Sequence, residues 1–227
     1  MCRERRGRLP PVVSARLSPL PEGFRATVAS LHRVAEDVVA AERMPAKEIA
    51  LEVTPGGFGT PEFEWEGSSH QIRVEGTELV REVDGRRQRE SLEINLAAAK
   101  ALADWYAFGA AVLERLAAES GPEDAPSPPI LWPEHFDLAI ELGSEPDGLR
   151  ATYGFSPGDD QHPEPYAYVG PWAPQPPGEL WNARGFGGAE LGYAELRQAE
   201  DQEAVALEFF SARRDTIAST KPTEETT

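Results

Sequence analysis

The feature that most constrains the fold of this chain is a long helical pattern at residues 92–119. Its apolar residues recur three or four positions apart, and alanine, the strongest helix former, fills much of the space between them. Gly121 and Pro122 end the pattern, and Trp105 lies on the apolar stripe, so we expect Trp105 to be buried. Gly109 weakens a helix at its centre and predicts close packing against another element.

The segments on both sides of this helix change to a period of two, which is typical of half-buried strands. Turn signals separate the strands, so neighbouring strands are expected to be antiparallel. The predicted strands are residues 47–54, 63–66, 71–75, 78–83, 136–142, 149–155 and 166–170. Helical spacing also predicts helices at residues 24–43 and 201–214. This order favours an α+β fold, in which antiparallel β-sheet segments pack with the long helix, an N-terminal helix and a C-terminal helix.

Four segments are predicted to lack regular structure because they are rich in glycine, proline or charge. Residues 54–61 (TPGGFGTP) are expected to be a loop, and residues 86–90 a short connection into the long helix. Residues 121–129 have the composition of a linker. Residues 171–192 are expected to form a long ordered loop.

The domain boundaries follow from the composition of the two ends of the chain. Residues 1–20 combine arginines with three prolines and show no apolar period, so we expect a disordered tail there. Residues 216–227 are polar and are expected to form a second disordered tail. Between them, residues 21–215 are predicted to form a single globular α+β domain. Whether this domain divides into two lobes, at residues 21–120 and 130–215, is left open.

Charge limits the partners that such a protein can have. The chain has 22 Lys and Arg against 39 Asp and Glu, a net charge of −17. A protein this acidic repels phosphate backbones, so nucleic acid is not an expected partner. No stretch of 18 apolar residues is present, so a membrane is not expected either. The single cysteine, Cys2, excludes an internal disulfide and a cysteine-based zinc site. These features predict a soluble, acidic, cytoplasmic protein and leave its oligomeric state open.

Two short clusters pair a histidine with carboxylates, whereas phosphate-loop, dinucleotide and nucleophile-elbow motifs are absent from the sequence. In the first cluster, period two places His135 and Asp137 on the polar face of a strand. The second cluster, Asp159 to Glu164, follows the next strand of a predicted hairpin, which could bring the two clusters together. Two imidazoles with carboxylates suit a divalent metal or acid–base catalysis. The candidate metal ligands are His135, Asp137, Asp159 and His162, and the candidate catalytic residues are His135, Asp137, His162 and Glu164. In the alternative interpretation, these side chains cap turns or face water.

Aromatic residues are concentrated between positions 132 and 193, which include three of the five tryptophans. They could line a groove for a small molecule or carbohydrate, or they could form the core beneath proline-rich loops. Trp172, Trp181 and Asn182 are the candidate ligand-binding residues, because their surroundings favour partial exposure.

Several segments resemble one family of proteins, found mainly in high-GC actinobacteria, to which no activity is assigned. The resemblance rests on TPGGFGTP at residues 54–61, LWPEHFDLA at 131–139 and YGFSPGDDQHPEPYAYVGPW at 153–172, with shorter matches at 181–183 and 188–196. It covers roughly residues 25–212. Family members carry a longer connection before the long helix than the one at residues 86–90. Because no activity is assigned to the family, the resemblance implies neither a reaction nor catalytic residues for this chain.

Three functions remain open from the sequence, and whether the protein is an enzyme is one of the open points. The first is binding of a small molecule or a protein partner by a soluble acidic protein. The second is a metal-dependent, hydrolase-like enzyme that uses the histidine and carboxylate clusters, with a divalent metal as cofactor. The third is a structural or interaction protein.

Overall fold

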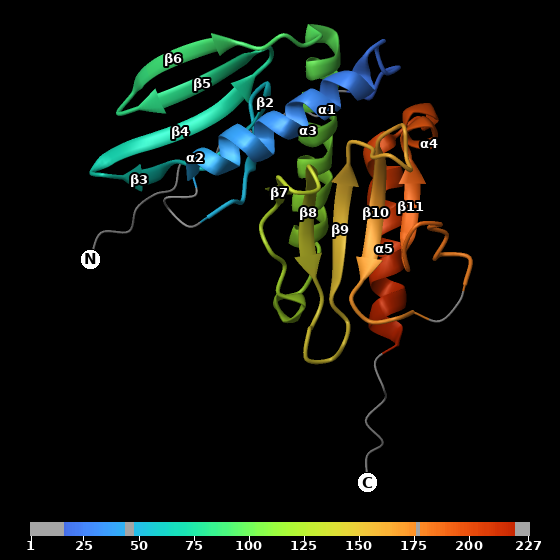
Figure 1. Ribbon diagram of the computed structural model, residues 1–227. Helices are drawn as coiled ribbons and strands as arrows, with labels where there is room; N and C mark the ends of the chain where they lie inside the picture. Colours follow the sequence, from blue (N-terminus) through green and yellow to red (C-terminus); the bar gives the residue numbers. More distant parts are fainter. Residues whose placement is uncertain (1–15, 44–47, 176–177, 221–227) are drawn as a thin grey trace.

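Helix α3 (Leu96–Ala118) packs against two antiparallel β-sheets in the computed structural model, which describes residues 16–43, 48–175 and 178–220 (Figure 1). Asn95 caps the N-terminus of α3, and its side chain accepts a hydrogen bond from the backbone N–H of Ala98. Buried apolar residues from both sheets belong to one hydrophobic cluster. The predicted α+β fold with antiparallel sheets and a long helix is confirmed.

The first sheet has six strands in the order β1-β2-β4-β5-β6, and β3 also pairs with β4. All of its strand pairs are antiparallel. The strands are β1 (Glu52–Thr54), β2 (Gly57–Gly59), β3 (Phe63–Trp65), β4 (Ser68–Glu75), β5 (Glu78–Val83) and β6 (Arg86–Ser91).

The second sheet is a five-stranded meander in the order β11-β10-β9-β8-β7. An antiparallel bridge between Leu51 and Leu131 joins it to the first sheet. The strands are β7 (Ile130–Trp132), β8 (Asp137–Leu142), β9 (Ala151–Ser156), β10 (Tyr166–Pro171) and β11 (Ala189–Gly192). The predicted hairpin at residues 136–155 is therefore present as β8 and β9.

Helices cover one face of the five-stranded sheet. Helix α3 contacts β8 and β9, helix α5 (Gln202–Ser219) contacts β10, and in Figure 1 both helices lie behind the strands. The N-terminal helix consists of α1 (Phe24–Val34), the π-helical η1 (Ala35–Ala40) and α2 (Ala41–Arg43), and α1 packs against α3. The remaining helices of the described residues are the 3-10 turn η3 (Pro122–Asp124) and α4 (Tyr193–Gln198).

Two adjacent aromatic residues of α3 attach the helix to the five-stranded sheet. Trp105 is 0% exposed, and its indole N–H donates to the carbonyl of Ser156 at 2.9 Å. The Tyr106 hydroxyl donates to the carbonyl of Phe136 at 2.6 Å. A Cβ at Gly109 would lie 2.8 Å from the Phe155 ring, so the helix approaches β9 as closely as only glycine allows.

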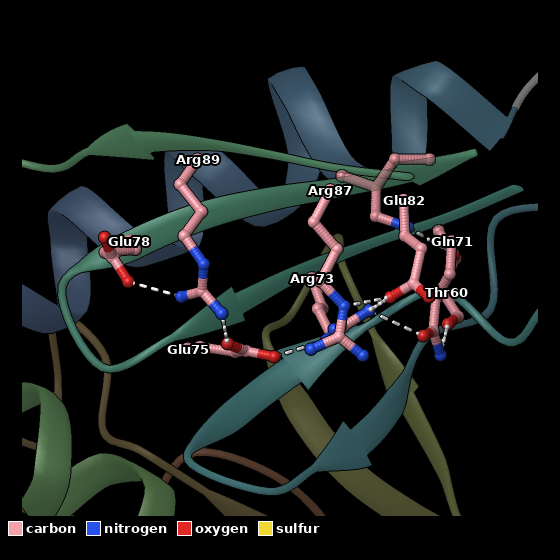
Figure 2. A network of polar contacts seen from close by, with 9 residues as sticks. Thr60, Gln71, Arg73, Glu75, Glu78, Glu82, Arg87 and Arg89 are labelled. Atoms are coloured by element: carbon pink, nitrogen blue, oxygen red, sulfur yellow. Dashed lines mark hydrogen bonds and ion pairs between the residues drawn. The ribbon is translucent and has the colours of Figure 1, made fainter. Parts of the chain in front are cut away.

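Strand β6 corrects the expected short connection at residues 86–90. All six of its residues are exposed, so no hydrophobic period could reveal it. The strand pairs with β5 along its whole length, and Figure 2 shows its arginines against glutamates of β4 and β5. Charged residues also protect an exposed sheet edge from pairing with other chains. The ion pairs are Arg87–Glu82, Arg89–Glu75 and Arg89–Glu78.

Arg73 lies at the centre of this network and is only 7% exposed. Its guanidinium donates to Glu75, Glu82 and Gln71. Val80, the partner of Arg73 across the strands, is 0% exposed although it lies on the same charged face. Long arginine side chains therefore cover apolar surface on this face of the sheet.

The segment at residues 54–61 is also more regular than expected, because β2 is a buried strand within it. A Cβ at Gly57 would lie 2.2 Å from the carbonyl oxygen of Val74. A Cβ at Gly59 would lie 2.4 Å from the Cβ of Arg73. These glycines allow close approach to β4 and do not mark a loop.

At both ends, residues that were assigned to the predicted tails pack against the domain. The buried Leu17 donates its backbone N–H to Gln202 at 2.7 Å, and Tyr193 donates its hydroxyl to the carbonyl of Ser18. Helix α5 continues to Ser219 with Ile217 buried. The remainder of the two predicted tails, residues 1–15 and 221–227, lies outside the described residues.

Two other irregular segments contain more structure than predicted. The expected linker at residues 121–129 begins with η3 and then lies beside β8, where Ser127 and Glu141 exchange two hydrogen bonds. The expected loop at residues 171–192 ends in β11. Both additions are short, and β11 consists of only four residues.

Helix α3 is long and apolar enough to cross a membrane by length and composition. Half of its most apolar window is buried inside the protein. Its apolar stripe contacts strands of both sheets, as expected for the central helix of a folded domain.

Replacing Trp105 with alanine tests the attachment of α3. Trp105→Ala should lower the free energy of unfolding by about 3–5 kcal/mol, the usual cost of deleting a large core aromatic. Chemical denaturation would measure this loss. Trp172→Ala is the matched control, because Trp172 is 50% exposed and its removal should cost less than about 1 kcal/mol. Equal losses in the two variants would show that Trp105 does not carry the packing.

Candidate functional site

The face of the five-stranded sheet opposite α3 and α5 is hollowed. This hollow has a volume of about 990 Å³ and opens to solvent. In Figure 1 this face points toward the viewer. Side chains of α1, of the sheet and of its loops line it: His32, Trp132, Glu134, His135, Asp137, Glu141, Thr152, Ser156, Asp159, Gln161, Tyr166, Tyr168, Gly170 and Phe186.

Strand register explains why polar and aromatic side chains meet on this face. Alternate residues of a strand share a face, so the core side chains point toward α3 and the residues between them point into the hollow. Ser156 pairs with Tyr166, Gly154 with Tyr168, and Glu141 with Thr152. The floor of the hollow is therefore a grid of small, hydroxyl and carboxylate residues, with two tyrosines on β10.

Tyr168 reaches across β9 to bond Asp137 on β8. Its hydroxyl donates to the Asp137 carboxylate, and the two residues are 31 positions apart in the chain. Gly154 lies between them, and a Cβ there would be 2.6 Å from the Tyr168 ring. The phenol ring can lie flat over the strand only because position 154 is glycine.

Asp137 is buried in an unusual way for a carboxylate. It is 7% exposed, and its second oxygen, Oδ1, has no hydrogen-bond partner in the described part of the chain. Burial raises the pKa of Asp137, the Tyr168 hydrogen bond and the nearby His135 lower it, and Glu134 raises it, with a net increase. Burial and the Asp137 charge in turn raise the pKa of the Tyr168 hydroxyl.

The turn that leads into β8 differs from the predicted strand. Residues 133–136 form a turn, and the strand begins only at Asp137. Phe136 has a φ of 53°, a left-handed conformation that costs energy in a bulky residue. Its ring is fully buried, stacks on His32 and meets Tyr106 edge to face. This packing turns Phe136 away from the predicted alternation and leaves His135 exposed.

His162 belongs to a local network at the other end of the hollow. Its backbone N–H and ring Nδ1 contact Asp159 at 2.8 and 3.0 Å, and Tyr166 donates its hydroxyl to the same carboxylate. Its Nε2 forms an ion pair with Glu190 at 3.3 Å. Burial raises the pKa of Asp159, but these hydrogen bonds outweigh it and the pKa is lowered overall.

The two predicted histidine clusters come near each other, because His135 and His162 both line a smaller hollow of about 250 Å³. His32 lines it as well. Within residues 16–43, 48–175 and 178–220, however, no three His, Cys, Asp or Glu side chains gather so that they could hold a metal ion. The metal site at His135, Asp137, Asp159 and His162 stays a prediction without support from the geometry.

The remaining candidates lie around the hollow or outside it. Glu164 is exposed and lines neither hollow. Trp172 donates its indole N–H to Thr152, a lining residue. Trp181 packs against the core, and Asn182 exchanges two hydrogen bonds with the backbone of Glu190. Of the three ligand-binding candidates, Trp172 therefore lies beside the hollow, whereas Trp181 and Asn182 support the structure near β11.

No protein-family model, curated protein or solved structure matches the chain. The predicted resemblance to an actinobacterial family therefore stays a prediction.

The sequence predicted Asp137 as a site residue but did not connect it with the residues around it. Tyr168 and Phe186 were predicted only as two of the aromatic residues that could line a groove, and Gly154 was not assigned to a site. The period-two pattern at residues 152–156 and 166–170 placed threonine, glycine, serine and tyrosine on one face. That pattern could have predicted an open polar face, but not which strand lies beside which.

Removing the charge of Asp137 should stabilise the folded protein. Asp137→Asn should raise the free energy of unfolding at pH 7, because burial raises the pKa of Asp137 and so makes its charged form costly in the folded protein. The folded-state pKa is raised, so the wild type carries a penalty that is absent below the unfolded pKa and complete above the folded pKa. Urea denaturation at pH 7 and at pH 3 would measure it.

At pH 3 the free energies of unfolding of Asp137→Asn and the wild type should be nearly equal. Glu164→Gln is the control, because Glu164 is an exposed carboxylate and its removal should change stability by less than about 0.5 kcal/mol. A loss of stability in Asp137→Asn at pH 7 would contradict the expected cost of burying this charge.

Gly154→Ala should displace the Tyr168 ring from Asp137. The added methyl group would lie within 2.6 Å of the ring, and relieving such an overlap typically costs about 1–3 kcal/mol. Thermal unfolding and a crystal structure of the variant would show the loss and the moved ring. Gly170→Ala on the same face is the control, since no described atom lies within 4 Å of its Cβ position. An unmoved Tyr168 in Gly154→Ala would refute the role given to this glycine.

Proposed function

We propose that the protein binds a small organic molecule in the hollow on the open face of the five-stranded sheet. The observation that carries this proposal is the buried Asp137 carboxylate, one oxygen of which has no partner in the described part of the chain. A buried polar atom without a hydrogen bond costs stability, and folded proteins rarely retain one without a role. A ligand in the hollow could supply the missing donor.

The form of the hollow supports binding. A volume of about 990 Å³ falls at the upper end of the usual range for small-molecule sites. The aromatic rings of Trp132, Tyr166, Tyr168 and Phe186 offer apolar contact, and a few polar groups converge beside them. The strand ends below the hollow are fixed by hydrogen bonds from α3, so the site is formed before a ligand arrives.

A second candidate function uses the same hollow for acid–base catalysis. The raised pKa of Asp137 favours it, because a carboxyl that keeps its proton nearer neutral pH can act as a general acid. Binding without turnover and catalysis share the site and differ only in whether a bound molecule is changed.

The single cysteine in the sequence and the net charge of −17 support a cytoplasmic protein that does not bind nucleic acid.

A fragment screen observed by NMR tests the location of the site. Each tryptophan has a separate indole N–H signal, and Trp132 lines the hollow whereas Trp105 is buried on the other side of the sheet. Fragments that bind should shift the Trp132 signal and leave the Trp105 signal in place. Binding that shifts only Trp65, which is on β3, or no binding by any fragment, would reject the hollow as a ligand site.

A further inference from the structure

We infer that the ligand of this hollow carries a positively charged nitrogen, an ammonium or guanidinium group, that binds Asp137. This inference rests on the proposed function and adds the chemical class of the ligand. Its starting point is geometric, because Tyr168 already donates to one oxygen of Asp137 and the other oxygen is left without a donor among the described residues.

The charge of the lining favours a cation. Four carboxylates line the hollow, at Glu134, Asp137, Glu141 and Asp159. Among the described lining residues none is lysine or arginine. A surface of one sign in a concave site raises the local concentration of ligands of the opposite sign. An anionic ligand would meet repulsion from every charged carboxylate in the wall.

Asp137 forms no ion pair with a lysine or arginine within the described ranges of the chain. Arg150, which pairs with the lining residue Glu141, also donates to the carbonyl of Gly143. Arg25, near His162, pairs with Asp160. A buried carboxylate without a cation is costly, and a ligand cation would compensate it at the place where it is buried.

The aromatic side chains offer the second element of cation recognition. A cation is attracted to the face of a tryptophan, tyrosine or phenylalanine ring within about 6 Å of its centre. Tyr168 meets Phe186 edge to face with 6.2 Å between ring centres, and Tyr168 also bonds Asp137. The carboxylate and the aromatic rings therefore belong to one continuous wall.

A neutral ligand with hydroxyl groups, such as a sugar, is the main competitor. A hydroxyl could donate to the free oxygen of Asp137, but it would leave the buried charge without compensation. Charge-assisted hydrogen bonds are about twice as strong as neutral ones. The two classes therefore differ in affinity for the same site, and matched probes separate them.

The experiment compares three probes that share a phenyl ring and a short chain: phenethylamine, 2-phenylethanol and 3-phenylpropionate. NMR titrations at pH 8 would follow the Trp132 indole signal in the full-length protein. Phenethylamine should bind at least about tenfold more tightly than 2-phenylethanol, a difference of about 1.4 kcal/mol. Binding of 3-phenylpropionate should be the weakest of the three.

Two variants identify the charge that is responsible. Asp137→Asn keeps the shape of the side chain and should reduce the preference for the amine over the alcohol to less than about twofold. Glu164→Gln also removes one negative charge, but from a residue outside the hollow, and should keep the preference. The comparison of amine and alcohol in the wild type stands even if a variant fails to fold.

The outcomes separate this inference from the proposed function. If the alcohol or the acid shifts Trp132 as strongly as the amine does, the hollow is a ligand site but not one for cations. Cation specificity at Asp137 is likewise rejected if Glu164→Gln loses the preference as fully as Asp137→Asn. If none of the three probes shifts Trp132 and the fragment screen also fails, both the site and its cation specificity are rejected.

Discussion

Two hydrogen bonds from α3 determine where the open face of the five-stranded sheet lies. Trp105 and Tyr106 are adjacent, fully buried residues of the helix and donate to the carbonyls of Ser156 and Phe136. These carbonyls lie where β9 ends and just before β8 begins. Because the helix occupies one face of the sheet, every alternate residue on these strands must point the other way. The hollow around Asp137 is a consequence of that arrangement.

The open face of the five-stranded sheet has a cost in folding stability that the hydrophobic core lacks. Asp137 is covered by Tyr168 and by the sheet, which removes the carboxylate from water without giving its second oxygen a donor among the described residues. Such costs are usually retained where function requires them. The six-stranded sheet shows the contrast, because Arg73 is as deeply buried there and donates to three neighbouring side chains. The two sheets thus treat these buried charges in opposite ways, and Asp137 keeps a polar atom for an outside partner.

Sequence patterns predicted the elements that have a hydrophobic period. They missed the strands that are stabilised by ion pairs or that lie close against a neighbouring backbone. The limits of β5 agree with the predicted strand, and α3 and the β8–β9 hairpin were found because apolar residues recur at the right period. Strand β6 has no apolar residue and is held by backbone pairing and ion pairs, so its sequence resembles a charged loop. Strand β2 is rich in glycine because its backbone lies against β4, and by composition alone such glycines predict a turn.

The sequence by itself determined the α+β class, the long central helix with Trp105 on its buried side, and Asp137 as a candidate residue. Those features depend on local periodicity and on residue chemistry, which are visible in one segment at a time. Only the tertiary structure decided that Tyr168 lies over Gly154 to reach Asp137, that Phe136 leaves the strand pattern, and that the arginines of β6 find glutamates. Each of these depends on which strands become neighbours and on what covers a side chain, because contacts between distant residues and the loss of water around a charge arise only when the chain is folded.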